Sequence, residues 1–242
     1  MSVHPPAALA AGAGPPQKRP LRCYTDSVSR LIVYVDGFNF YYGAVKQTPY
    51  KWLNFNKLFK ILFPKDDLVL VRYFTARVKN NPLNPGQRGR QGAYLRALRT
   101  LPDFEIHEGF FLSHPVNMPV APPGTGFARV LKFEEKGSDV NLATYLMLDA
   151  IEDRFDVAAV VSHDSDLALP IQIVNERLGK PVGVVGYDPR FQRKYGKRPR
   201  TSERLRQVAA FYKTLRESAF RRAQFPDVVQ SQDGPIHKPS GW

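Results

Sequence analysis

The sequence predicts an α/β fold in which helices cover both faces of a mostly parallel central sheet. Three continuous apolar runs, at residues 31–35, 157–161 and 182–185, predict strands that are buried on both faces. Predicted helices separate these strands, and strands that alternate with helices are typical of a parallel sheet in a three-layer domain. The length of 242 residues suits one such domain with appendages, or two small domains.

The other elements follow from apolar spacing and from turn residues. We expect strands at residues 68–75 and 104–112, and helices at 38–45, 55–62, 94–98, 139–152 and 167–178. Ser138 is expected to cap the fourth of these helices, because a serine hydroxyl accepts a hydrogen bond from the first helical turn.

Two segments predict irregular structure. Residues 80–92 are polar and rich in Asn and Gly, which indicates a long loop. Residues 114–126 contain four prolines and two glycines, which indicates an excursion from the core.

The chain divides into three predicted parts. Residues 1–29 are rich in Ala, Pro and Gly without apolar periodicity, and we expect a disordered or loosely packed arm. Residues 30–188 form the predicted domain. Residues 189–242 are expected to be a basic C-terminal extension with one amphipathic helix, at residues 205–219, and a flexible tail.

Positive charge dominates the sequence and is unevenly placed. The chain has 35 Lys and Arg residues against 22 Asp and Glu, a net charge of +13. Residues 77–99 hold six basic residues and no acid, and residues 190–222 hold twelve against two acids. This balance predicts a polyanionic partner such as nucleic acid, the alternative being a solvated surface that only aids solubility. The predicted phosphate-binding residues are Arg88, Arg90, Arg193, Lys194, Lys197, Arg198 and Arg200.

Several classes of protein are excluded by composition and motifs. No apolar run approaches the roughly 18 residues of a membrane helix, and residues 1–22 lack the pattern of a secretory signal. A single cysteine, Cys23, excludes an intramolecular disulfide framework and a cysteine zinc cluster, so we expect a cytoplasmic protein. The sequence contains no nucleotide-binding glycine motif and no nucleophile elbow.

Acidic residues follow the predicted strands at one edge of the sheet. Asp36 ends the first strand, Asp164 and Asp166 follow the strand at residues 157–161, and Asp139 opens a helix. Ligands of parallel α/β sheets bind at the carboxyl ends of the strands. Crowded carboxylates repel one another unless a cation neutralises them, and oxygen ligands suit Mg²⁺ or Mn²⁺.

Each acid taken singly also has an ordinary structural explanation. Asp36 suits a turn, Asp139 favours the positive end of its helix, and Asp166 could cap the helix that follows it. His163 could be a ligand, a proton shuttle or a plain loop residue. The grouping of all four acids at one sheet edge is what favours a functional site.

Three motifs together resemble a known family. The segments VDGFN at 35–39, KGSDV at 136–140 and SHDSDL at 162–167 resemble the NYN domain of the PIN-like nuclease superfamily, close to its bacterial LabA-like branch. The resemblance covers about residues 30–188 and implies a PIN-like three-layer α/β sandwich with a metal-dependent ribonuclease site. It places metal-binding acids at Asp36, Asp139, Asp164 and Asp166, with Asn39 in the same pocket and Ser162 and Ser138 in support.

The leading hypothesis is a phosphodiesterase that cuts RNA with Mg²⁺ or Mn²⁺. The cation would activate water, while Asp166 or Asn39 orients water or substrate. A non-catalytic RNA-binding or protein-binding module is one alternative, and a catabolic oxygenase or hydrolase for a small molecule is another. The sequence leaves open whether the chain forms a homo-oligomer.

Overall fold

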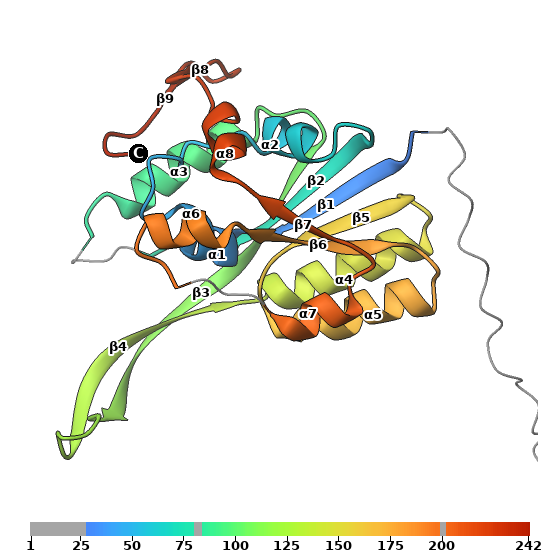
Figure 1. The fold of residues 1–242 in the computed structure, drawn as a ribbon. Helices are drawn as coiled ribbons and strands as arrows, with labels where there is room; N and C mark the ends of the chain where they lie inside the picture. The colour runs from blue at the N-terminus through green and yellow to red at the C-terminus, as the bar shows by residue number, and fades with distance from the viewer. Residues whose placement is uncertain (1–27, 80–83, 199–201) are drawn as a thin grey trace, which may run out of the picture.

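A seven-stranded sheet between two layers of helices forms the computed structural model of the protein, which describes residues 28–79, 84–198 and 202–242 (Figure 1). The strand order is β4-β3-β2-β1-β5-β6-β7, and only β3 and β4 pair in antiparallel orientation. This confirms the predicted α/β class with a mostly parallel sheet. The strands are β1 (Arg30–Asp36), β2 (Asp67–Ala76), β3 (Phe104–Pro119), β4 (Phe127–Lys136), β5 (Val157–Val161), β6 (Val182–Tyr187) and β7 (Tyr212–Leu215).

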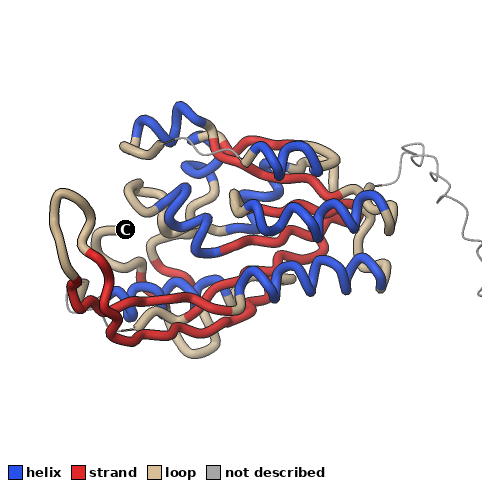
Figure 2. Tube along the Cα trace, turned by 90° about the horizontal axis from the view of Figure 1, so that it is seen from below, coloured by secondary structure: helices blue, strands red, loops and turns tan. Residues whose placement is uncertain are grey.

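The helices divide between the two faces of the sheet, as the labels of Figure 1 show. Figure 2, a view from below, shows the helices of the second face lying along the strands. None of the described helices is long and apolar enough to cross a membrane. The first face carries α1 (Gly37–Phe40), a π-helical turn (Tyr41–Val45), α2 (Phe55–Leu62), α3 (Gln87–Leu98), α6 (Pro189–Lys194) and α8 (Glu217–Arg222). The second carries α4 (Ser138–Ile151), α5 (Ala168–Glu176) and α7 (Glu203–Val208).

The central strand β1 shows why these apolar runs form buried strands. Successive side chains of a strand point to opposite faces. Leu31 and Val33 accordingly join the core under α1, α2 and α3, whereas Ile32 and Tyr34 join the core under α4 and α5. Because both faces are covered by helices, β1 is buried and largely apolar from Leu31 to Val35.

The C-terminal segment differs from the predicted single amphipathic helix. Residues 203–222 form two short helices, α7 and α8, separated by β7, which pairs in parallel with β6. The sheet therefore continues past residue 188, where the predicted domain ended. The aromatic rings at 211 and 212 pack over β6 at Gly183 and Gly186, where a Cβ atom would lie 2.1 and 1.7 Å from ring or hydroxyl atoms. Pairing with β6 thus overrides the helical spacing of residues 205–219.

The C-terminal tail, which the sequence predicted to be flexible, also contains regular structure. Residues 223–242 contain the small hairpin of β8 (Val228–Val229) and β9 (Ile236–His237). The ring of Trp242 packs against Trp52 and Tyr94, with centroid distances of 6.4 and 5.5 Å. The predicted N-terminal arm, by contrast, falls almost entirely on residues 1–27, which lie outside the described part of the chain.

The two segments predicted to be irregular contain regular structure. The proline-rich excursion is a hairpin, because β3 continues to Pro119 and pairs with β4 from Phe110 through Pro119. Both hairpin strands extend beyond the sheet, as Figure 1 shows. The predicted loop at 80–92 is replaced from Gln87 onward by α3, whose N-cap is Gly86 with a φ of +80°.

A buried ion pair ties α4 to the sheet. The guanidinium of Arg72 on β2 donates to both carboxylate oxygens of Asp149 on α4, at 2.7 and 2.9 Å. The hydroxyl of Tyr34 on β1 donates to the same carboxylate at 2.7 Å. Arg72 is 2% exposed and Asp149 is fully buried. One carboxylate therefore joins β1, β2 and α4 inside the second core.

Replacing Asp149 tests this role. Asp149→Asn removes the buried counter-charge of Arg72 and leaves it only the half-exposed carboxylate of Glu105, so the free energy of unfolding should fall by about 3–5 kcal/mol. Arg154→Gln is the matched control, because Arg154 bonds the same carboxylate at 3.2 Å from a half-exposed position and should cost less than about 1 kcal/mol. Urea unfolding measures both variants, and equal losses would contradict the account.

Candidate functional site

Asp36 lies at the carboxyl end of the central strand. Its Oδ1 accepts a hydrogen bond from the backbone N of Asn39 at 3.0 Å, which makes Asp36 the N-cap of α1. Its Oδ2 accepts a hydrogen bond from Oγ of Ser162 at 2.9 Å. The carboxylate is buried, with the residue 5% exposed. Asp36 therefore caps a helix and is not the turn residue that the sequence allowed, and its two hydrogen bonds hold the carboxylate in one orientation.

The segment after β5 interlocks with the segment after β1. The two strands pair in parallel with Val35 opposite Val161, so Asp36 and Ser162 leave the sheet side by side. Oγ of Ser162 accepts a hydrogen bond from the backbone N of Asp164 at 3.0 Å. Oδ1 of Asn39 accepts one from the backbone N of His163 at 3.1 Å. The predicted residues of the first and third motifs thus form one hydrogen-bonded unit.

Asp164, and not Asp166, caps the helical turn that follows β5. Oδ1 of Asp164 accepts a hydrogen bond from the backbone N of Asp166 at 3.0 Å, at the start of a 3₁₀ turn over Ser165–Leu167. The carboxylate of Asp166 is therefore exposed and is not the cap that the sequence allowed. The imidazole of His163 stacks on the ring of Tyr187, the last residue of β6, at 4.6 Å.

The second motif brings Asp139 into the group and adds an acid that the sequence analysis missed. The N-cap of α4 is Gly137, with a φ of +98°, so the predicted cap at Ser138 is wrong. Ser138 instead donates from Oγ and from its backbone N to Oε1 of Glu135, at 2.7 and 3.2 Å. Asp139 lies in the first turn of α4. Glu135 could have been suspected from the sequence only by its place just before the motif.

The carboxylates of the site interact electrostatically. Burial raises the pKa of Asp36 to about 6, the hydrogen bonds from Asn39 and Ser162 oppose the rise, and the charges of Asp139 and Asp164 add to it. Burial also raises the pKa of Asp139, followed by the charges of Asp164, Glu135 and Asp166. These acids therefore destabilise one another, as the sequence analysis expected of a cation site.

The donor set matches one kind of metal ion. All candidate ligands are oxygens, as Mg²⁺ and Mn²⁺ prefer. Within the described residues, however, no three His, Cys, Asp or Glu side chains are grouped closely enough to hold an ion among themselves. Mg²⁺ commonly retains several waters and is bound through one or two carboxylates together with substrate phosphates. The site fits an ion held in that way and does not provide an all-protein cage.

Of the seven predicted phosphate-binding residues, three have exposed side chains, three are engaged within the protein, and one lies outside the described residues. Arg88 on α3, Arg193 on α6 and Arg198 have exposed side chains. Arg200 lies outside the described residues.

The other three are engaged within the protein. Lys194 donates to Glu217 at 2.7 and 2.9 Å, so a structural ion pair uses its charge. Nζ of Lys197 donates to the backbone oxygen of Tyr42 at 2.6 Å, and burial lowers the pKa of this lysine to about 8. Arg90 is half-buried and donates to Oδ1 of Asn84 at 2.5 Å.

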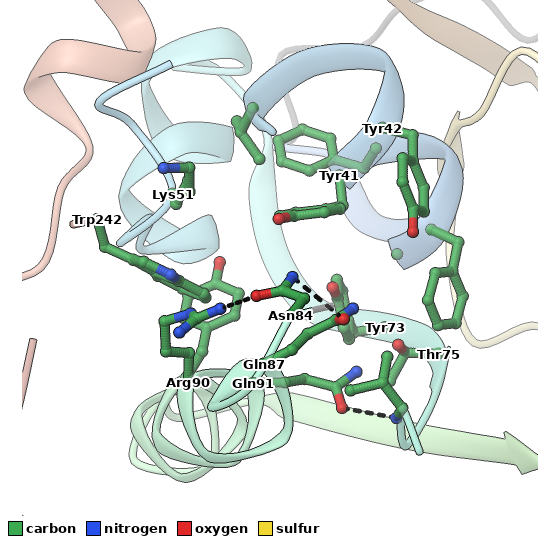
Figure 3. A pocket seen from close by; sticks show the side chains of 16 residues that line it. Tyr41, Tyr42, Lys51, Tyr73, Thr75, Asn84, Gln87, Arg90, Gln91 and Trp242 are labelled. Atoms are coloured by element: carbon green, nitrogen blue, oxygen red, sulfur yellow. Dashed lines mark hydrogen bonds between the residues drawn. The ribbon is translucent and has the colours of Figure 1, made fainter. Parts of the chain in front are cut away.

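A cavity of about 80 Å³ lies next to Asp36, and the sequence analysis missed it (Figure 3). Its lining begins at Gly37 and Phe38, directly after Asp36, and includes Arg90 and Trp242. Four aromatic residues close together in the sequence, Phe38, Phe40, Tyr41 and Tyr42, are part of its lining and could have indicated it. The remaining walls come from segments that are distant in sequence.

Comparison with known families decides the classification. The model of the NYN domain family matches residues 30–216. The chain belongs to the NYN domain family. This family is part of the PIN-like nuclease superfamily and is usually nuclease-like, and the match extends through β7 as the sheet does.

Two proteins are similar to this chain, one in sequence and one in structure. The chain is 33% identical over 183 residues to "6-hydroxy-3-succinoylpyridine 3-monooxygenase HspA" of Pseudomonas putida (strain DSM 28022 / S16). The aligned region covers 64% of this chain and 59% of that enzyme. The chain thus spans less than two thirds of the length of this enzyme. A crystal structure of a protein of unknown function from Vibrio parahaemolyticus matches with a TM-score of 0.51 at 20% identity, over 81% of this chain and 98% of the other. That likeness shows the fold alone.

The raised pKa of Asp36 predicts a stability gain when its charge is removed. The folded-state pKa of about 6 exceeds the ordinary value of 3.8, so ionisation costs stability above pH 6 and costs nothing below about pH 4. In EDTA at pH 7.5, Asp36→Asn should raise the free energy of unfolding by about 1–3 kcal/mol. The gain should shrink as the pH falls from 6 to 4 in urea unfolding. A loss of stability at pH 7.5 would contradict the account of the site, and Glu152→Gln, at the far end of α4, is the control.

Proposed function

We propose that this protein hydrolyses phosphodiester bonds in RNA with the help of Mg²⁺ or Mn²⁺. The observation that carries the proposal is Asp36, a carboxylate whose pKa is raised first by burial and further by the charges of Asp139 and Asp164. A cation relieves this repulsion, and Mg²⁺ and Mn²⁺ bind carboxylates of this kind in the presence of phosphate. Membership of a usually nuclease-like family supports the same reaction.

The residues of the site have distinct parts in the proposed reaction. Asp36, Asp139, Asp164 and Asp166 are the candidates for holding the cation, which would lower the pKa of water and neutralise charge on the phosphate. The backbone of Asn39 and the hydroxyl of Ser162 keep the Asp36 carboxylate fixed.

The surface charge supports a polyanionic substrate. Arg88 and Arg193 are exposed on helices of the face that also carries α1, the helix that Asp36 caps, and Arg198 follows α6. Exposed arginines can bind the phosphates of an RNA backbone whatever the base sequence. Lys194 and Lys197 are not assigned to phosphate binding, because both form hydrogen bonds within the protein.

Cleavage of labelled RNA in Mn²⁺, and separately in EDTA, tests the proposal. The wild type should cut only with the cation, and Asp36→Asn and Asp164→Asn should each lower the rate by about a hundredfold or more. Glu152→Gln is the matched control, because it removes an exposed carboxylate at the opposite end of α4, and its rate should equal that of the wild type. Circular dichroism checks that each variant is folded.

Two results would contradict the proposal. Near-wild-type cleavage by Asp36→Asn would show that Asp36 takes no part in the reaction. Binding of RNA without cleavage, in the presence of either cation, would favour a non-catalytic module on the same fold.

A second candidate function is oxidation of a small aromatic compound. It is favoured by the 33% identity to an enzyme named as a 6-hydroxy-3-succinoylpyridine 3-monooxygenase, and by the aromatic cavity next to Asp36. Oxygen uptake on addition of 6-hydroxy-3-succinoylpyridine and a reduced nicotinamide or flavin cofactor would support it. The same assay distinguishes it from RNA hydrolysis, which consumes no oxygen.

A further inference from the structure

The cavity beside Asp36 has walls suited to a planar ring. It lies between α1, the π-helical turn, β2 and α3, and Figure 3 shows tyrosine and tryptophan side chains around it. Tyr73 and Tyr94 are buried, while Tyr41 and Trp242 are half-buried. Aromatic side chains bind flat rings by stacking and by edge-to-face contact. These walls offer such contacts to a ring that enters from solvent.

Two cations line the same cavity without a counter-charge. Nζ of Lys51 donates to the backbone oxygen of Gly241 at 3.0 Å, and Arg90 donates to neutral oxygens of Asn84 and Pro85 at 2.5 and 3.3 Å. Neither cation forms an ion pair with a carboxylate of the described chain. Burial and the nearby charge of Arg90 lower the pKa of Lys51. An anion placed between these two cations would relieve their repulsion.

The cavity adjoins Asp36, but none of the acids of the site lines it. Gly37 and Phe38, the first lining residues, follow Asp36 directly, whereas none of the acids of the site is part of the lining. A ligand in the cavity would therefore lie next to Asp36, with its negative charge bound by Lys51 and Arg90.

We propose that this cavity binds a planar aromatic ring that carries an anionic group. The ring lies among the tyrosines and Trp242, and the anion binds Lys51 and Arg90. Two sources supply this chemistry, namely a nucleotide, either free or within RNA, and a small aromatic acid. The inference does not rest on phosphodiester hydrolysis, because binding uses none of the acids of the site.

Tryptophan fluorescence of the full chain in EDTA tests the inference without any reaction. The chain has two tryptophans, and Trp242 lines the cavity while Trp52 contacts Trp242. We expect a saturable change in fluorescence on titration with AMP, with nicotinate, or with both. The ligand that binds identifies the source: AMP indicates a nucleotide, and nicotinate indicates a small aromatic acid. Adenosine and nicotinamide, which lack the anion, should bind about tenfold or more weakly.

Charge variants assign the binding to this cavity. Arg90→Gln and Lys51→Gln should each weaken binding by about tenfold or more, since each removes a charge-assisted hydrogen bond. Arg96→Gln is the matched control, because Arg96 is exposed on the same helix α3 and is not part of the lining. Its affinity should equal that of the wild type.

Three results would overturn the inference. The first is the absence of a saturable signal with either ring anion at millimolar concentration. The second is equal weakening by Arg90→Gln and Arg96→Gln, which would indicate general charge attraction. The third is equal binding of inorganic phosphate and AMP together with equal binding of acetate and nicotinate, which would show that the ring contributes nothing.

Discussion

The buried ion pair of Arg72 and Asp149 is the constraint on which the arrangement of the site depends. A charge in a core is tolerated only with its partner in place, so the pair fixes α4 against β2. Tyr34 donates to the same carboxylate and ties β1 to that point. Tyr34 lies two residues before Asp36, and Asp149 lies on the helix that begins beside Asp139. Anchoring three elements inside the second core therefore sets the positions of two acids at the edge of the sheet.

The site itself is held by local hydrogen bonds against electrostatic repulsion. Asp36 receives one hydrogen bond from the helix that it caps and one from Ser162 on the neighbouring segment, and both favour its charged form. Burial and the charges of Asp139 and Asp164 outweigh them, so the pKa of Asp36 rises to about 6. A fold without a use for this cluster could lower its energy by losing one charge. The retained repulsion is the physical basis for proposing a cation at the site.

The sequence predicts the parts of this molecule that depend on local pattern. Apolar runs identify β1, β5 and β6, and acids directly after strands identify Asp36 and Asp164, because parallel strands end at one edge. Elements that depend on distant partners are missed. The spacing of residues 205–219 fits a helix, yet β7 forms there because β6 offers glycines beneath its aromatic rings. Arg72 and the cavity walls outside residues 37–45 leave no local signal, since their partners come from distant segments.

The most direct test of the cation site is calorimetric titration with Mn²⁺ at pH 6 and at pH 8, in buffers of different ionisation enthalpy. With the pKa of Asp36 at about 6, that carboxyl is about half protonated at pH 6, and a cation binding there displaces the proton. We predict saturable Mn²⁺ binding that releases about half a proton at pH 6 and almost none at pH 8. Binding should be lost in Asp36→Asn. The absence of Mn²⁺ binding at both pH values, or undiminished binding by Asp36→Asn, would contradict the account.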